Sequence, residues 1–267
     1  VSYYYFGYWM MGTITKLTGI PTSISYNLAL ALIPALAGVG VFGLTYNLIR
    51  SETRRLSYAI AGGVFASVLL TLTSNLEGVL EFIRANAMGP QAFWDWLRID
   101  GLEEPISEVA RNWRPDESWW WWRSTRVINT FVDGQGIDYT IQEFPFFSFM
   151  LGDLHPHVIA IPFVLLFLTF CFNFLAGSTD KASTVNMDES PHTPSRNSSR
   201  KDYFISMVAI GLSLGGLAFT NMWDFPIFAL LFLIVAGLRM YLICGSGTWA
   251  LIRGTFLVGA TVIGLAF

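Results

Sequence analysis

The chain has 267 residues, of which 53% are hydrophobic and only 13% are charged. Ordinary soluble domains contain roughly 25% charged residues, so this composition indicates a membrane protein and excludes an ordinary soluble enzyme. The formal net charge of −3 indicates neither nucleic-acid binding nor a strongly basic patch for a membrane surface.

Apolar stretches long enough to cross a membrane recur along the chain. A spanning helix needs about 20 mostly apolar residues. Five windows meet or approach this length: 26–49, 56–76, 157–175, 203–222 and 225–244. A sixth window begins near Leu251. We therefore predict an all-α fold, a polytopic transmembrane helix bundle with about six spans in a single membrane domain, 1–267. The chain begins at Val1 and ends inside an apolar run, so we expect further helices of the same protein to complete it.

Basic residues gather on one side of these windows. If the spans alternate in direction, nine basic residues lie on the same side of the membrane: Arg50, Arg54, Arg55, Lys181, Arg196, Arg200, Lys201, Arg239 and Arg253. Basic residues near spans favour the cytoplasm, whereas long loops are largely exempt from this rule. We therefore expect a multi-pass protein of the plasma membrane, with residues 77–154 and the functional site facing the outside.

The outer segment 77–154 is rich in tryptophan. Seven of the ten tryptophans lie between Trp94 and Trp122, and four of them are consecutive. Tryptophan collects at membrane interfaces, so the segment is predicted to form short interfacial helices on the outer leaflet. Alternatively, or in addition, aromatic rings line a groove for a lipid tail or stack on a sugar. Trp122 of this segment and Tyr4 of the N-terminal tyrosine run are the candidates.

The segment 177–202 has the opposite character. It is rich in Ser, Thr, Asn, Pro and charged residues and contains no aromatic residue. Such a composition cannot bury enough apolar surface to fold, so we predict a disordered cytoplasmic linker.

The motif Asp153-Leu-His155-Pro-His157 is the first candidate for chemistry. Pro156 disfavours the helical conformation at His155 and suits the first turn of a following helix. In an extended chain, alternate side chains share one face, so Asp153, His155 and His157 could converge on one point. They would then serve as catalytic acid–base groups or hold a divalent metal ion, the one cofactor that the sequence suggests. The alternative is a helix cap at Asp153 beside two interfacial histidines.

Arg123 and Arg126 are candidates for binding the substrate. The planar fork of arginine matches phosphate or carboxylate oxygens, so this pair is a plausible clamp for a lipid phosphate. The alternative is salt bridging to Asp116 or Glu117.

Three acidic residues complete the predicted binding site. Glu77 and Glu81 are four residues apart and share one helical face, so they either line a cavity or mark where a helix leaves the lipid. Asp224 lies in a short outer turn between two spans. It either contributes a polar group to the cavity or simply punctuates the turn.

Several motifs together resemble a known membrane family. They are Tyr3-Tyr-Tyr-Phe-Gly7, Gly19-Ile-Pro21 with Tyr26-Asn-Leu-Ala-Leu-Ala31, Glu143-Phe-Pro-Phe-Phe-Ser-Phe149 and Gly152-Asp-Leu-His-Pro-His157. With these motifs the chain resembles the YYY family of multi-spanning membrane proteins, although Ser2 stands where that family usually has Asn.

The YYY family is similar to GT-C-type glycosyltransferases, which transfer a sugar from a polyprenyl-phosphate donor at the outer face of a membrane. The resemblance implies the same activity here, with membrane lipid and a polyprenyl-phosphate-linked sugar as partners. Such enzymes carry an essential acidic residue in the first outer loop, which we expect in sequence preceding Val1. Two other functions remain open: a transporter or channel, which needs polar residues along a whole helix face, and a non-catalytic assembly protein.

Overall fold

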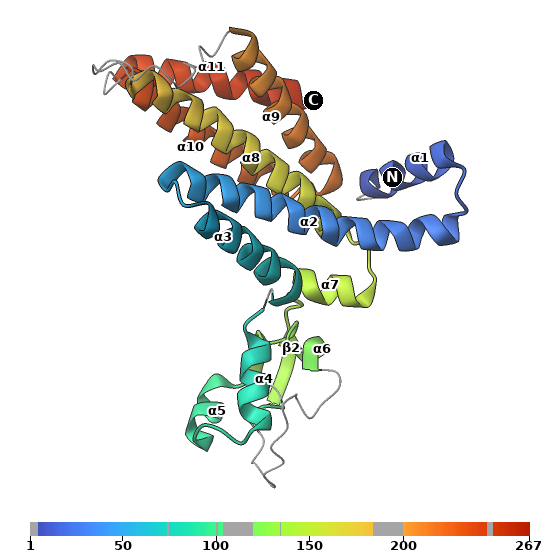
Figure 1. Ribbon diagram of the computed structural model, residues 1–267. Helices are drawn as coiled ribbons and strands as arrows, with labels where there is room; N and C mark the ends of the chain where they lie inside the picture. Colours follow the sequence, from blue (N-terminus) through green and yellow to red (C-terminus); the bar gives the residue numbers. More distant parts are fainter. Residues whose placement is uncertain are drawn as a thin grey trace. The chain divides into compact units, whose positions relative to one another are not determined.

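The computed structural model describes residues 5–73, 75–99, 101–103, 120–133, 135–183, 200–244 and 248–267. Helices dominate this part of the chain (Figure 1). The predicted site residue Tyr4 lies outside the described residues.

Six helical stretches are long and apolar enough to cross a membrane, which confirms the predicted polytopic bundle. They belong to helices α2 (Thr22–Glu52), α3 with a π-helical end η1 (Leu56–Val68, Leu69–Thr73), α8 (Pro156–Ser183), α9 (Arg200–Thr220), α10 (Asp224–Cys244) and α11 (Thr248–Ala266). A shorter helix, α1 (Phe6–Thr18), precedes them. Helix α8 continues beyond the predicted start of the linker, and α9 begins before its predicted end. Residues 184–199 of the linker lie outside the described part.

The chain divides into two compact units, which we treat separately. The helical unit comprises residues 1–64 and 154–267, and the loop unit comprises residues 65–153. The loop unit therefore holds nearly all of the predicted outer segment.

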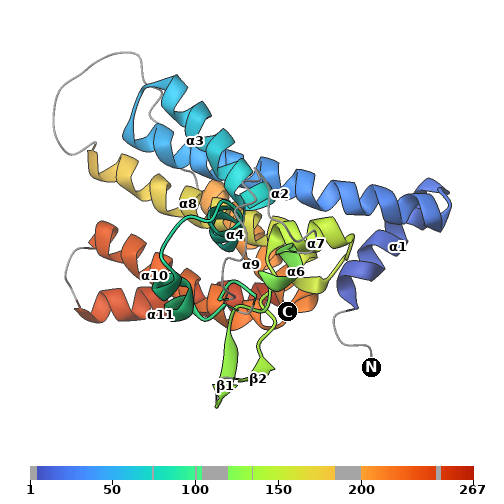
Figure 2. The ribbon, with the colours of Figure 1, turned by 90° about the horizontal axis from the view of Figure 1, so that it is seen from below.

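The core of the helical unit lies among α8, α9, α10 and α11, and α2 packs along α8 (Figure 2). Its buried side chains are almost all apolar, with Phe167, Phe232 and Leu214 fully enclosed. Large apolar side chains such as Leu212 and Phe256 are exposed on the outside of the unit. A surface of this kind suits hydrocarbon rather than water.

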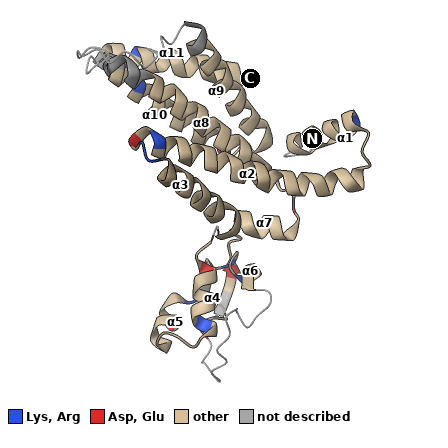
Figure 3. Cartoon of the chain, viewed as in Figure 1, with Lys and Arg blue, Asp and Glu red and all other residues tan. Residues whose placement is uncertain are grey.

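Charged residues of the helical unit lie near the helix ends, with long uncharged stretches between them (Figure 3). Helices α2, α8 and α10 run in the same direction, so their C-terminal ends lie at one end of the unit (Figures 1 and 2). Arg50 and Arg239 are close to two of these ends. This arrangement supports the predicted grouping of basic residues on one side of the spans.

Besides η1, the described part of the loop unit contains the short helices α4 (Glu77–Ala85), α5 (Gln91–Leu97), α6 (Trp120–Arg123) and α7 (Pro145–Leu151). Its small core consists of Trp94, Ile99 and Leu102, with partly buried side chains of α4 and α5 around them. Helix α7 packs against η1.

A β-hairpin, which the sequence analysis did not predict, also lies in this unit. Strand β1 (Asn129–Val132) pairs antiparallel with β2 (Gln135–Tyr139), and Asn129 faces Tyr139.

The contact between α9 and α11 depends on a glycine and generates a prediction. A Cβ atom at Gly215 would collide with the backbone carbonyl oxygen of Ala266, which cannot rotate away. Gly215→Ala should therefore destabilise the helical unit by roughly 1–3 kcal/mol and lower the apparent melting temperature in detergent.

Gly43→Ala on α2 is the matched control, because a Cβ atom there meets nothing within 4 Å. This variant should melt at or slightly above the temperature of the unmodified protein, because alanine favours helix. Equal melting temperatures for the two variants would contradict the close approach of α9 and α11.

Candidate functional site

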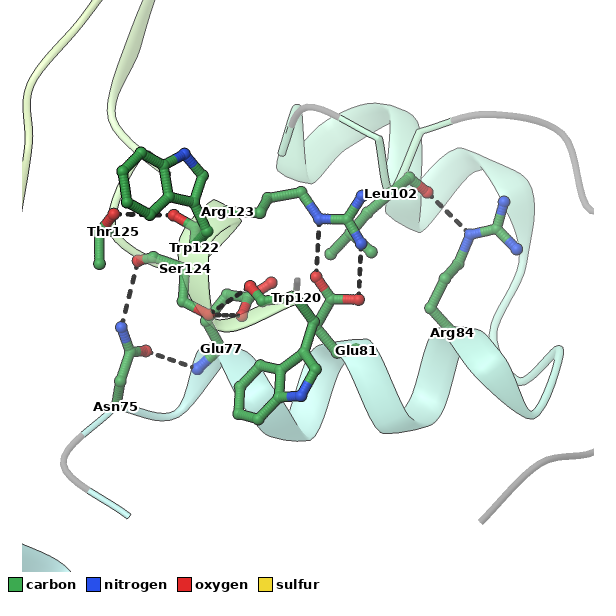
Figure 4. A network of polar contacts seen from close by, with 10 residues as sticks. All are labelled: Asn75, Glu77, Glu81, Arg84, Leu102, Trp120, Trp122, Arg123, Ser124 and Thr125. Atoms are coloured by element: carbon green, nitrogen blue, oxygen red, sulfur yellow. Dashed lines mark hydrogen bonds and ion pairs between the residues drawn. The ribbon is translucent and has the colours of Figure 1, made fainter. Parts of the chain in front are cut away.

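Two carboxylates of α4 face α6 within the loop unit (Figure 4). Glu77 and Glu81 lie one helical turn apart, and both side chains are buried, with 5% and 3% exposure. Helix α4 begins at Glu77 because the side-chain oxygen of Asn75 accepts a hydrogen bond from the Glu77 backbone N–H (2.7 Å). The prediction that these glutamates share one face is therefore confirmed.

Glu81 forms a two-pronged ion pair with Arg123. The Nε and Nη2 atoms of Arg123 donate to the two carboxylate oxygens of Glu81 at 2.7 and 2.8 Å. This geometry is the strongest that an arginine and a carboxylate can adopt. The fork of Arg123 is therefore occupied by protein and is not open to a phosphate. The alternative partners considered from the sequence, Asp116 and Glu117, lie outside the described residues.

Among the described residues, no cation forms such an ion pair with Glu77. Its Oε2 atom accepts a hydrogen bond from the Ser124 hydroxyl at 2.5 Å. Burial raises the pKa of Glu77 to about 8, although the Ser124 bond opposes the shift. The charge of Glu81, and a hydrogen bond to it, raise the pKa further, and Arg123 lowers it. At pH 7 the protonated form of Glu77 therefore predominates.

Glu77 also lines a cavity in the loop unit. The cavity has a volume of about 570 Å³, within the range typical of small-molecule sites. Its walls are mainly aliphatic, and four polar residues interrupt them: Asn75, Glu77, Ser124 and Gln142. An apolar cavity with a few polar groups and one carboxyl of strongly shifted pKa has the features of a binding or catalytic site.

Arg126 differs from Arg123 in its surroundings. Its guanidinium carbon lies 3.8 Å from the centre of the Trp122 ring and 5.5 Å from that of Tyr139. The Nη1 atom donates to the Trp122 carbonyl oxygen (3.2 Å) and to the Thr125 hydroxyl. No carboxylate pairs with Arg126 in the described part of the chain.

The predicted histidines lie in the helical unit, at the start of α8. The rings of His155 and His157 are 5.0 Å apart; His155 is exposed and His157 is half-buried. Asp224, the first residue of α10, interacts electrostatically with His157 and hydrogen-bonds with Asn221. The fold thus brings a carboxylate and a histidine from two distant parts of the sequence to the beginnings of two membrane helices.

Asp153 is the last residue of the loop unit and is half-buried. Its backbone N–H donates to the Ser148 carbonyl oxygen (3.2 Å), just after Gly152 ends α7 in a left-handed conformation. Helix α8 begins at Pro156, as the sequence predicts. Within the described ranges, no three His, Cys, Asp or Glu side chains are placed to hold a metal ion. The metal role predicted for Asp153, His155 and His157 therefore has no structural support.

Sequence reasoning missed three members of the loop-unit site: Asn75, Ser124 and Gln142. Asn75 lies within the predicted window 56–76, whereas in the structure it accepts a hydrogen bond from the first residue of α4. Nothing local marks Ser124 or Gln142, because their roles depend on α4, which is distant in the sequence.

These features define a polytopic helical membrane protein with a buried acidic pair and a cavity in the segment between its second and third candidate spans. The family model described as "Uncharacterized membrane protein (DUF2298)" matches residues 1–267, and the chain belongs to this family. No curated protein and no solved structure matches the chain.

The raised pKa of Glu77 predicts that stability depends on pH. A carboxyl whose pKa rises on folding, here from 4.5 to about 8, binds its proton more tightly in the folded state. Its stabilising contribution is complete below about pH 4.5 and is lost as the pH rises through 8. The apparent melting temperature should therefore fall between pH 5 and pH 9.

Glu77→Gln should flatten this pH dependence, because the amide remains neutral at every pH. Thermal unfolding of the detergent-solubilised protein, followed by tryptophan fluorescence, measures both profiles. Parallel profiles for the variant and the unmodified protein would show that Glu77 does not hold the proton.

Proposed function

We propose that the protein is a membrane glycosyltransferase of the GT-C type, which transfers a sugar from a polyprenyl-phosphate donor at the outer face of the plasma membrane. The observation that carries this proposal is the buried Glu77 carboxyl on the wall of the loop-unit cavity. Sugar transfer to a hydroxyl needs a base near the reacting oxygen, and a base works best when its pKa lies near the working pH.

Glu77 acts as that base in its ionised form. It accepts the proton of the acceptor hydroxyl while the acceptor oxygen bonds to the anomeric carbon of the sugar. The bond from that carbon to the phosphate oxygen breaks, and polyprenyl phosphate leaves with the electron pair. Glu81 is bound to Arg123, and its charge raises the pKa of Glu77, which makes Glu77 a stronger base.

The apolar part of the cavity wall favours a lipid-linked substrate. Leu76, Leu80, Ile99 and Val127 offer hydrocarbon contacts, whereas the polar groups are few. A site of this composition suits a molecule that joins an isoprenoid chain to a polar head.

The residues of the Asp-x-His-x-His motif take supporting roles in this proposal. His157 interacts electrostatically with Asp224, and this pair is the candidate for relaying a proton. Asp153 and His155 keep the roles suggested by the sequence, as candidates for binding the phosphate leaving group or relaying a proton.

The test is a transfer assay with the full-length protein in proteoliposomes and a panel of polyprenyl-phosphate sugars. Turnover should rise with pH and level off above an apparent pKa near 8, because only ionised Glu77 accepts the proton. Glu77→Gln should lower turnover by roughly 10²-fold or more. Asp153→Asn and His155→Ala should lower it less.

Glu52→Gln is the matched control, since Glu52 is an exposed carboxylate at the end of α2 in the helical unit. It should leave turnover unchanged. Full activity of Glu77→Gln on every donor that the unmodified protein accepts would refute the assigned base. If no donor in the panel is turned over, the sugar-transfer proposal itself fails.

A further inference from the structure

Arg126 presents an unused hydrogen-bonding edge. Both described hydrogen bonds of its guanidinium leave from Nη1. The Nε and Nη2 atoms, which form the fork that binds carboxylate or phosphate, have no partner among the described residues. Arg123, three residues earlier in the same segment, uses the same two atoms to bind Glu81. The two arginines therefore differ in whether a described residue occupies this edge.

The guanidinium of Arg126 is also fixed in place. Stacking on Trp122 and the two bonds from Nη1 restrict its rotation, so little side-chain entropy remains to be lost when an anion binds. A fixed, half-buried cation whose fork meets no described residue has the geometry of a receptor for an oxyanion.

Exposed apolar and aromatic side chains lie close to Arg126 in the sequence and on strand β2 of the hairpin. Trp122 is 42% exposed and Tyr139 52%, while Ile128 and Ile137 are 61% and 62% exposed. Water is a poor solvent for such a group of side chains. Tryptophan, tyrosine and arginine beside aliphatic residues are typical of the lipid–water interface.

The connections of the loop unit keep it close to a membrane. The unit begins inside the candidate span Leu56–Thr73, and the span at Pro156 starts three residues after the unit ends. Each linking residue adds at most about 3.5 Å. A bilayer surface is therefore the partner that this segment always has within reach.

We propose that Arg126, with the rings of Trp122 and Tyr139, forms a docking site for the phosphate headgroup of an anionic phospholipid. The Nε–Nη2 edge binds phosphate oxygens, and the exposed rings and isoleucines contact the interfacial part of the bilayer. The site is independent of the proposed sugar transfer, because it needs neither Glu77 nor a donor substrate.

The experiment measures which lipids stay bound to the full-length protein. The protein is released from mixed micelles that contain equal amounts of phosphatidylglycerol and phosphatidylcholine, and bound lipids are counted by native mass spectrometry. Arg126→Gln should lower retention of phosphatidylglycerol roughly tenfold, the loss expected for one charge-assisted fork. Arg126→Lys should restore only part of it, because lysine keeps the charge without the fork.

Arg98→Gln is the matched control, since it removes the same charge from an exposed position in the same unit. It should retain phosphatidylglycerol like the unmodified protein, and both glutamine variants should keep the melting temperature. Unchanged retention in Arg126→Gln would overturn the proposal. An equal loss in Arg98→Gln would overturn it too, because attraction would then depend only on total charge. Displacement of the lipid by millimolar inorganic phosphate would identify a site for free phosphate instead.

Discussion

The ion pair between Glu81 and Arg123 is the interaction on which the loop-unit site depends. It joins α4 to α6 across 42 residues of sequence, and the Glu81 side chain is almost fully buried. Once Arg123 is held, Ser124 lies beside Glu77, and its carbonyl oxygen accepts a hydrogen bond from Asn75. Removing Arg123 would cost about 3–5 kcal/mol, because the buried charge of Glu81 would be left without a partner.

The charge balance of this site favours the protonated form of Glu77. With Glu77 neutral, Glu81 and Arg123 cancel each other. With Glu77 ionised, two buried carboxylates face one guanidinium, and the excess negative charge has little solvent around it. The same arrangement makes Glu77 a strong base whenever it loses the proton. The stabilising contribution at low pH and the proposed role as a base at higher pH therefore come from one property of the site.

The membrane architecture could be predicted because it depends on local physics. Length and hydropathy alone identify the spans, and the fixed φ angle of Pro156 marks where α8 begins. The β-hairpin was missed although Asp133-Gly134, a common hairpin turn sequence, stands between its strands. The surrounding tryptophans suggested interfacial helices, and the strands are only four and five residues long. Because the segment has little hydrophobic periodicity, its tryptophan-rich composition led to the prediction of helices, and the hairpin turn sequence was not given weight.

The two arginines show why the details of the site could not be predicted. Arg123 and Arg126 have similar neighbours in sequence, and both were candidates for binding phosphate. Their fates diverge because Arg123 points to Glu81 on a distant helix, whereas Arg126 stacks on Trp122 from its own segment. The i to i+4 spacing of Glu77 and Glu81 showed that they share a face, but not which cation that face meets. A pairing across 42 residues is a property of the folded unit, and it decides which arginine remains open to a ligand.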